Sequence, residues 1–194
     1  MNNNYFVDEV VSTTSLPITI DLIKKHVSND YINKLNQVKY LGNICLILEL
    51  KKPLSDRDWI NINDSSFPFV GIIEHTNFIS KKNYRNNPLA YISKYIPVND
   101  SLYKLSDEEY LNYCIPYIQR VFPDFTKEDI LEYFIWRAEY AQPIITKGYD
   151  KLIPDIKSEI DNLFLCTMAQ IFPEDRGTNY AIKKGFEMAK ILDE

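Results

Sequence analysis

The residues best suited to hold a ligand lie near the carboxyl end of the chain. They form the run Phe172-Pro173-Glu174-Asp175-Arg176-Gly177-Thr178-Asn179-Tyr180-Ala181. An apolar stretch, residues 163–169, precedes this polar turn, and a helical pattern with small residues at Gly185 and Ala189 follows it. A turn between a buried strand and a helix presents free backbone N–H groups and the positive helix end to an anionic or electron-rich ligand. The same pattern is also typical of a helix that packs on a sheet and binds nothing.

A histidine is the residue of this chain best suited to acid or base chemistry near neutral pH. His75 ends an apolar run, directly after Glu74 and before the polar pair Thr76 and Asn77. His26, the other histidine, falls in a predicted short surface helix. His75 is therefore the candidate catalytic residue, and a structural histidine bonded to the following loop is the alternative.

Two polar residues in a later apolar strand pattern are candidates for substrate binding. Arg137 is expected to pair with Glu139 or Glu132, or with an anionic group of a substrate, because a buried guanidinium needs a partner. Gln142, which precedes Pro143, could place its amide over a substrate or simply end the strand.

Composition excludes several classes of protein. The 194 residues are 45% hydrophobic, and the net charge of −5 comes without a basic block, so neither disorder nor nucleic-acid binding is expected. No apolar run approaches the roughly 20 residues that span a bilayer, and the first residues lack the layout of a signal peptide, which favours a cytoplasmic protein. Cys45, Cys114 and Cys166 are widely spaced without a CxxC or Cys/His pair, so we expect buried thiols and no metal site.

Hydrophobic periodicity predicts an α+β fold. The predicted strands are residues 7–13, 39–50, 58–63, 69–75, 89–96 and 130–141, and the last strand of the chain is 163–169. Ser106 and Glu109 form a capping-box pattern that starts a helix ending at Phe122. We expect residues 39–96 and 130–141 to form one mixed, mostly antiparallel sheet flanked by this helix, with the terminal strand-turn-helix apart from it. The continuous apolar run 39–50 predicts a strand buried on both faces.

Several of these segments together resemble one family. They are residues 163–181, Val7-Asp8-Glu9-Val10-Val11-Ser12-Thr13, Tyr40-Leu41-Gly42-Asn43-Ile44-Cys45-Leu46-Ile47-Leu48, Ile73-Glu74-His75-Thr76-Asn77 and Arg137-Ala138-Glu139-Tyr140-Ala141-Gln142-Pro143. Nearly the whole chain resembles the carboxyl-terminal half of FAD-dependent oxidoreductases of the amine oxidase, protoporphyrinogen oxidase and phytoene desaturase type.

The resemblance implies a role for the polar turn as the cofactor-binding segment, residues 175–181. The N–H groups of Thr178, Asn179 and Tyr180 would face the pyrimidine edge of the flavin, while Asp175 and Arg176 would shape the turn. Tyr180-Ala181 stands where the family more commonly has Gly-Ala.

The resemblance also implies a domain organisation. Residues 1–16 would be a strand of the flavin-binding domain, 17–147 the substrate-binding domain, and 148–194 a flavin-capping strand-turn-helix belonging to the FAD-binding domain. The family carries its dinucleotide-binding GxGxxG turn near the amino terminus, and the five glycines of this chain do not have that spacing. The expected partner is thus an amino-terminal FAD-binding half, absent or on a separate chain, and the isolated chain should bind FAD weakly or not at all.

The sequence leaves three functions open. The first is part of an FAD-dependent oxidoreductase that dehydrogenates a C–N or C–C bond, with hydride passing to the flavin. The second is a folded, non-catalytic fragment that forms homo-oligomers through uncovered surfaces. The third is part of a sugar-nucleotide mutase relative, in which reduced flavin acts as a nucleophile.

Overall fold

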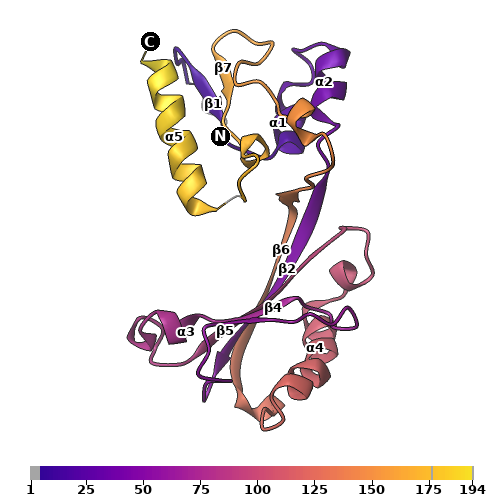
Figure 1. The fold of residues 1–194 in the computed structure, drawn as a ribbon, viewed down its shortest axis with the longest axis vertical. Helices are drawn as coiled ribbons and strands as arrows, with labels where there is room; N and C mark the ends of the chain where they lie inside the picture. The colour runs from indigo at the N-terminus through magenta and orange to yellow at the C-terminus, as the bar shows by residue number, and fades with distance from the viewer. Residues whose placement is uncertain (1–4, 176, 194) are drawn as a thin grey trace. The chain divides into compact units, whose positions relative to one another are not determined.

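The computed structural model describes residues 5–175 and 177–193, and the chain forms two compact units (Figure 1). The terminal unit comprises Met1–Lys39 and Pro143–Glu194, and the central unit comprises Tyr40–Gln142. Residues 17–39 and 143–147, expected in the substrate-binding domain, therefore belong by their contacts to the terminal unit. The functions assigned to the three predicted segments stay predictions.

The central unit contains the predicted sheet. Its strands are ordered β3 (Trp59–Asn61), β4 (Gly71–Glu74), β5 (Leu89–Ile96), β2 (Tyr40–Leu50) and β6 (Ile130–Pro143). The pairs β3 with β4, β4 with β5, and β5 with β2 are antiparallel. Strands close in sequence pair most readily in this way, and the prediction of a mostly antiparallel sheet is confirmed.

One helix covers one face of this sheet. In α4 (Asp107–Val121) the backbone N–H of Glu109 donates to Ser106 Oγ at 3.3 Å, and the Glu109 carboxylate accepts from the Ser106 N–H at 2.8 Å, so the predicted capping box is present. Tyr110, Cys114 and Ile118 of this helix are buried against the sheet. The core residues of the sheet on that side are Ile44, Leu46, Leu48, Ile72, Ala90 and Ile92.

The opposite face of the sheet is only half-buried. Asn43, Cys45 and Ile47 of β2 lie opposite Tyr95, Ser93 and Tyr91 of β5, and all are half-buried or exposed. In β6, Tyr133 and Ile135 pack against the core, so the alternating, exposed Phe134 and Trp136 lie on the uncovered face. The expectation that β2 is buried on both faces is thus wrong, because a helix covers only one of them.

The terminal unit combines a small parallel sheet with three helices. They are β1 (Val10–Ser12), α1 (Leu16–Ile23), α2 (Asn29–Leu35), β7 (Leu163–Leu165) and α5 (Thr178–Leu192). β1 and β7 run parallel with Val10 opposite Leu163 and Ser12 opposite Leu165. The predicted strand 163–169 is shorter than expected, because Thr167 N–H donates to Gln170 Oε1 at 2.8 Å and turns the chain into a 3-10 helix.

The remaining elements are short. They are α3 (His75–Phe78) and the 3-10 helices Lys81–Asn83, Leu102–Lys104, Lys127–Asp129, Tyr149–Lys151 and Met168–Gln170. Within the described ranges, no helix has the length and apolar character needed to cross a membrane.

Candidate functional site

The amino end of α5 has no capping side chain among the residues that the structure describes. Gly177 is extended before the helix begins at Thr178, and no acidic side chain lies in the first turn. Tyr180 and Ala181 both donate their backbone N–H to the Gly177 carbonyl at 3.0 Å. Within residues 5–175 and 177–193, no hydrogen-bond acceptor caps the N–H groups of Thr178 and Asn179, and both residues are exposed. These two amides, at the positive end of a 15-residue helix, are suited to an electron-rich ligand.

The other residues of the predicted cofactor segment surround this end. Asp175 is exposed and directly precedes Arg176, which lies outside the described residues. Tyr180 is half-buried and Ala181 is exposed. Gly177, Thr178 and Asn179 thus lie at the amino end of α5, and their contact with a flavin stays a prediction.

Buried contacts fix the chain that leads to this turn. The hydroxyl of the buried Tyr149 donates to the Ala169 carbonyl at 2.8 Å, and its ring packs against Phe172. A polar hollow of about 180 Å³ lies beside the turn. It is lined by Gln170, Ile171, Phe172, Glu174, Tyr180, Lys183, Lys184 and Glu187.

The small-residue face of α5 is exposed. The helix packs into its unit through the buried Met188 and the half-buried Lys184 and Ile191. On other sides of the helix, Ile182 is 56% and Phe186 is 69% exposed. A Cβ added at Gly185 would meet nothing within 4 Å. The close packing suggested by these small residues is therefore not made within the described part of the chain.

A second hollow of the terminal unit lies along β1 and was not predicted from the sequence. It has a volume of about 600 Å³ and is lined by β1, α1 and residues 160–163. Three hydroxyl groups at the carboxyl end of β1 form a closed triangle, with Ser12 Oγ 3.2 Å from Thr14 Oγ1 and 2.8 Å from Thr19 Oγ1, and the two threonine oxygens 2.9 Å apart. The run Ser12-Thr13-Thr14 could have indicated a site here, because ligands of parallel sheets bind beyond the carboxyl ends of strands.

His75 lies in the central unit and is held by its neighbours. Its Nε2 is 2.8 Å from the Tyr84 hydroxyl, and its ring packs edge-on against Tyr84 and Tyr91. This is the bond to the following loop that a structural histidine would make. A catalytic role for His75 stays a prediction.

Arg137 anchors the start of α4. Its guanidinium donates to Asp107 at 2.6 Å and to the carbonyl oxygens of Leu105 and Tyr103 at 2.7 Å and 3.0 Å. The prediction that Arg137 pairs with Glu132 or Glu139 is thus wrong, because the residues at and just before the start of α4 bind its guanidinium instead.

Contact of Arg137 with a substrate stays a prediction, as does that of Gln142. Gln142 is half-buried near the end of β6.

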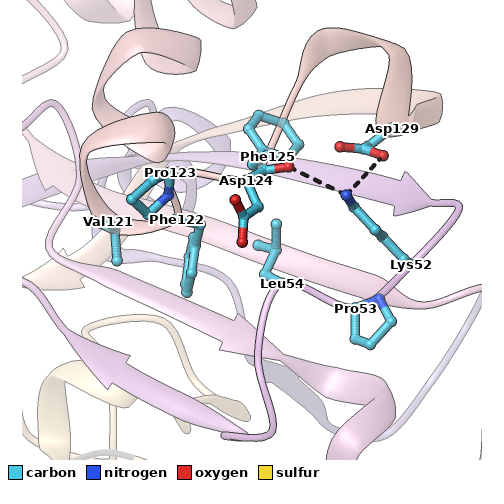
Figure 2. Close-up of a pocket in the computed structure, with 9 residues that line it drawn as sticks. All are labelled: Lys52, Pro53, Leu54, Val121, Phe122, Pro123, Asp124, Phe125 and Asp129. Atoms are coloured by element: carbon cyan, nitrogen blue, oxygen red, sulfur yellow. Dashed lines mark hydrogen bonds and ion pairs between the residues drawn. The ribbon is translucent and has the colours of Figure 1, made fainter.

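The central unit has a hollow of about 340 Å³, which the sequence did not predict (Figure 2). It is lined by Lys52, Pro53, Leu54, Val121, Phe122, Pro123, Asp124, Phe125 and Asp129. Lys52 Nζ lies 3.2 Å from the Asp124 carbonyl oxygen and 3.5 Å from an Asp129 carboxylate oxygen. The Thr126 backbone N–H, which donates to the Asp129 carboxylate, holds the pKa of that group below its ordinary value. The Lys52 and Asp129 side chains therefore stabilise the local fold around the hollow.

The three cysteines behave as packing residues. Burial raises the pKa of the Cys114 thiol to about 12, and burial also raises the pKa of Cys45 and Cys166. A raised pKa keeps a thiol protonated and unreactive near neutral pH. In the described ranges, no cluster of three or more metal-binding side chains is found.

The chain was compared with family models, curated proteins and solved structures. A family model described as flavin containing amine oxidoreductase matches residues 2–185. A comparison with curated proteins found no match.

Three solved structures share the fold. A protein described as a protoporphyrinogen oxidase, from Exiguobacterium sp. 255-15, is 12% identical with a TM-score of 0.67, over 96% of this chain and 42% of its own. An oxidoreductase from Methanosarcina mazei is 14% identical with a TM-score of 0.62, over 85% of this chain and 38% of its own. Reduced UDP-galactopyranose mutase is 16% identical with a TM-score of 0.57, over 75% and 32%. The chain thus spans about two fifths or less of the length of these relatives.

Proposed function

Since this chain belongs to the flavin-containing amine oxidoreductase family, we propose that it supplies the flavin-capping and substrate-binding parts of an FAD-dependent oxidoreductase. The observation that carries the proposal is the amino end of α5, where no side chain of the described residues caps the helix and where Thr178 and Asn179 are exposed. A segment with the GxGxxG turn, here called the dinucleotide-binding half, would hold the rest of the cofactor. FAD binding by this chain alone should therefore be weak or absent.

The residues present fit a flavin. When bound, FAD supplies a hydride acceptor for the dehydrogenation of a C–N or C–C bond. The N–H groups of Thr178 and Asn179 would donate to the pyrimidine edge of the ring and stabilise the negative charge that develops there. Tyr180 contributes less than the sequence suggested, because its N–H already donates to the Gly177 carbonyl.

We further propose that the uncovered face of the central sheet meets the substrate. Most of its side chains are aromatic or uncharged: Asn43, Cys45, Ile47, Tyr91, Ser93, Tyr95, Phe134 and Trp136. The charged Glu49 and Glu132 on the same face both pair with Arg85. Such a surface suits an apolar organic molecule better than a sugar nucleotide, whose diphosphate is usually bound by cationic donors. The dehydrogenase function is therefore preferred to the mutase alternative.

The experiment removes one N–H group from α5 without disturbing the helix. Thr178→Pro fits, because proline is favoured at the first helical position and the preceding Gly177 is extended. Thr178→Ala, which keeps the N–H, is the matched control. Each variant is mixed with the part of the Exiguobacterium relative that lies outside its match to this chain, here called the Exiguobacterium half, and bound FAD is measured by its visible absorbance.

We expect Thr178→Pro to weaken FAD binding by roughly tenfold or more, the effect of one lost hydrogen bond to a charge-bearing group, and Thr178→Ala to bind normally. Equal FAD binding by both variants would remove α5 from the flavin site.

The alternative of a non-catalytic, self-associating module is favoured by the exposed Ile182 and Phe186. It predicts a stable homodimer in light scattering and no flavin uptake with any dinucleotide-binding half.

A further inference from the structure

The carboxyl end of α4 borders the hollow of about 340 Å³ in the central unit (Figure 2). Val121 is the last residue of this helix, and Phe122, Pro123 and Asp124 follow it along the hollow. Leu54 lines the hollow from the segment after β2 and, like Val121 and Phe122, packs against the core beneath α4. The hollow therefore lies on the helix-covered side of the sheet, apart from the uncovered face that we propose for the substrate.

The hollow has apolar walls and the size of a small-molecule site. Its apolar lining residues are Pro53, Leu54, Val121, Phe122, Pro123 and Phe125. Phe122 is only half-buried, so its ring is accessible to a ligand. A volume of roughly 300 Å³ or more is typical of pockets that bind small molecules, and apolar walls give such pockets their affinity.

One carboxylate at the hollow has no partner. Asp129 accepts from the Thr126 N–H at 2.8 Å and lies 3.5 Å from Lys52 Nζ. Within residues 5–175 and 177–193, the Asp124 carboxylate forms no hydrogen bond or ion pair, and Lys52 Nζ instead contacts the main-chain carbonyl oxygen of Asp124 at 3.2 Å. Figure 2 shows the Asp124 carboxylate directed toward the space between Phe122 and Leu54.

Three features of the hollow favour a positively charged ligand. Lys52 offsets only one of the two carboxylates, Asp124 and Asp129, so the lining side chains carry an excess of negative charge. The hollow also lies at the negative end of the α4 dipole, which attracts cations. The face of the Phe122 ring attracts them too. A metal ion such as Ca²⁺ or Mg²⁺ would need a shell of oxygen ligands, which apolar walls do not supply, so the class that fits is a cation with an apolar body.

We propose that this hollow binds a small organic ammonium ion, with its charge at the Asp124 carboxylate and its apolar part against Leu54 and Phe122. The inference goes beyond the proposed function, because the site needs neither a flavin nor another chain. The two carboxylates would repel an anionic ligand, and a neutral ligand would gain little from Asp124.

Binding of cyclohexylammonium to the 194-residue chain tests the proposal. Cyclohexanol and cyclohexanecarboxylate have a similar apolar ring and are the neutral and anionic controls. Each compound is titrated at neutral pH and low ionic strength, because salt screens the attraction between exposed charges. Binding is followed by the NMR shifts of the backbone amides of Leu54, Phe122 and Phe125.

Two variants locate the charge that the ligand recognises. Asp124→Asn removes the carboxylate charge but keeps the shape of the side chain and the main-chain contact with Lys52. Glu128→Gln is the matched control, since it removes the same charge at an exposed position that does not line the hollow.

We expect the unmodified chain to bind cyclohexylammonium with a Kd on the order of 1 mM, as the few atoms of this ligand allow. It should bind either control compound at least about threefold more weakly. Asp124→Asn should abolish this preference, and Glu128→Gln should retain it.

Equal binding of cyclohexylammonium and cyclohexanol by the unmodified chain would overturn the proposal. The same conclusion would follow if the two variants lost equal affinity, because the attraction would then come from the overall charge of the chain. An absence of saturable shifts at the three amides would also overturn it.

Discussion

The exposed face of α5 provides a prediction in which one substitution has opposite effects on two measurements. Gly185 lies in the middle of the helix, and an added Cβ would meet nothing within 4 Å. Glycine in a helix interior is about 0.8–1 kcal/mol less favourable than a good helix former. Gly185→Leu should therefore stabilise the isolated chain by about 0.8 kcal/mol and raise its Tm by about 2–3 °C.

The same substitution should weaken the complex if this face packs closely on the dinucleotide-binding half or its cofactor. Overpacking a close contact costs about 1–3 kcal/mol, which corresponds to roughly a 5- to 150-fold loss of affinity. Lys190→Leu is the matched control, since it adds the same side chain at an exposed position about 140° away around the helix axis.

The assay pairs thermal melts of the isolated chains with titrations by the Exiguobacterium half. Lys184 is unsuitable as a control position, because it is only partly exposed and pairs with Glu187 at 3.1 Å. If Gly185→Leu raises the Tm and binds as tightly as Lys190→Leu, this face of α5 remains in solvent and the reasoning is refuted.

Three further predictions concern the central unit. Gly42→Ala should destabilise it by about 1–3 kcal/mol in urea unfolding, because an added Cβ would lie 2.9 Å from a side-chain atom and 3.2 Å from a carbonyl oxygen of β6; unchanged stability would show that β6 can shift. Arg137→Met should lower the free energy of unfolding by about 2–4 kcal/mol, since it leaves two carbonyl oxygens and a carboxylate without their donor. A loss of less than about 0.5 kcal/mol would contradict the role of Arg137 in holding the start of α4. The Thr126 N–H lowers the folded-state pKa of Asp129. The Asp129 carboxylate therefore stabilises the fold above the ordinary carboxyl pKa, and this stabilisation is lost as the pH falls through the folded-state pKa. Asp129→Asn should remove this contribution and flatten the dependence of the free energy of unfolding on pH between acid and neutral pH.

Local sequence signals predicted the local structure. The Ser106 and Glu109 pair set the start of α4 because a capping box involves only neighbouring residues. The polar turn before Thr178 likewise identified the start of α5. The antiparallel order of β3, β4 and β5 followed from short connections between apolar runs.

Features that depend on distant residues were not predicted. Arg137 pairs with Asp107, thirty positions away, rather than with a charge on its own strand. The terminal unit joins segments from both ends of the chain, which no local pattern indicates and which only the family resemblance implied.

The reduction potential of FAD bound to the reconstituted complex tests the central claim most directly, because it reports the donors at the flavin edge rather than folding or docking. Thr178→Pro should make the potential more negative than that of Thr178→Ala by about 30 mV or more, which corresponds to the loss of one hydrogen bond that strengthens when the flavin is reduced. Identical potentials in the two complexes would contradict the claim that the amino end of α5 contacts the flavin.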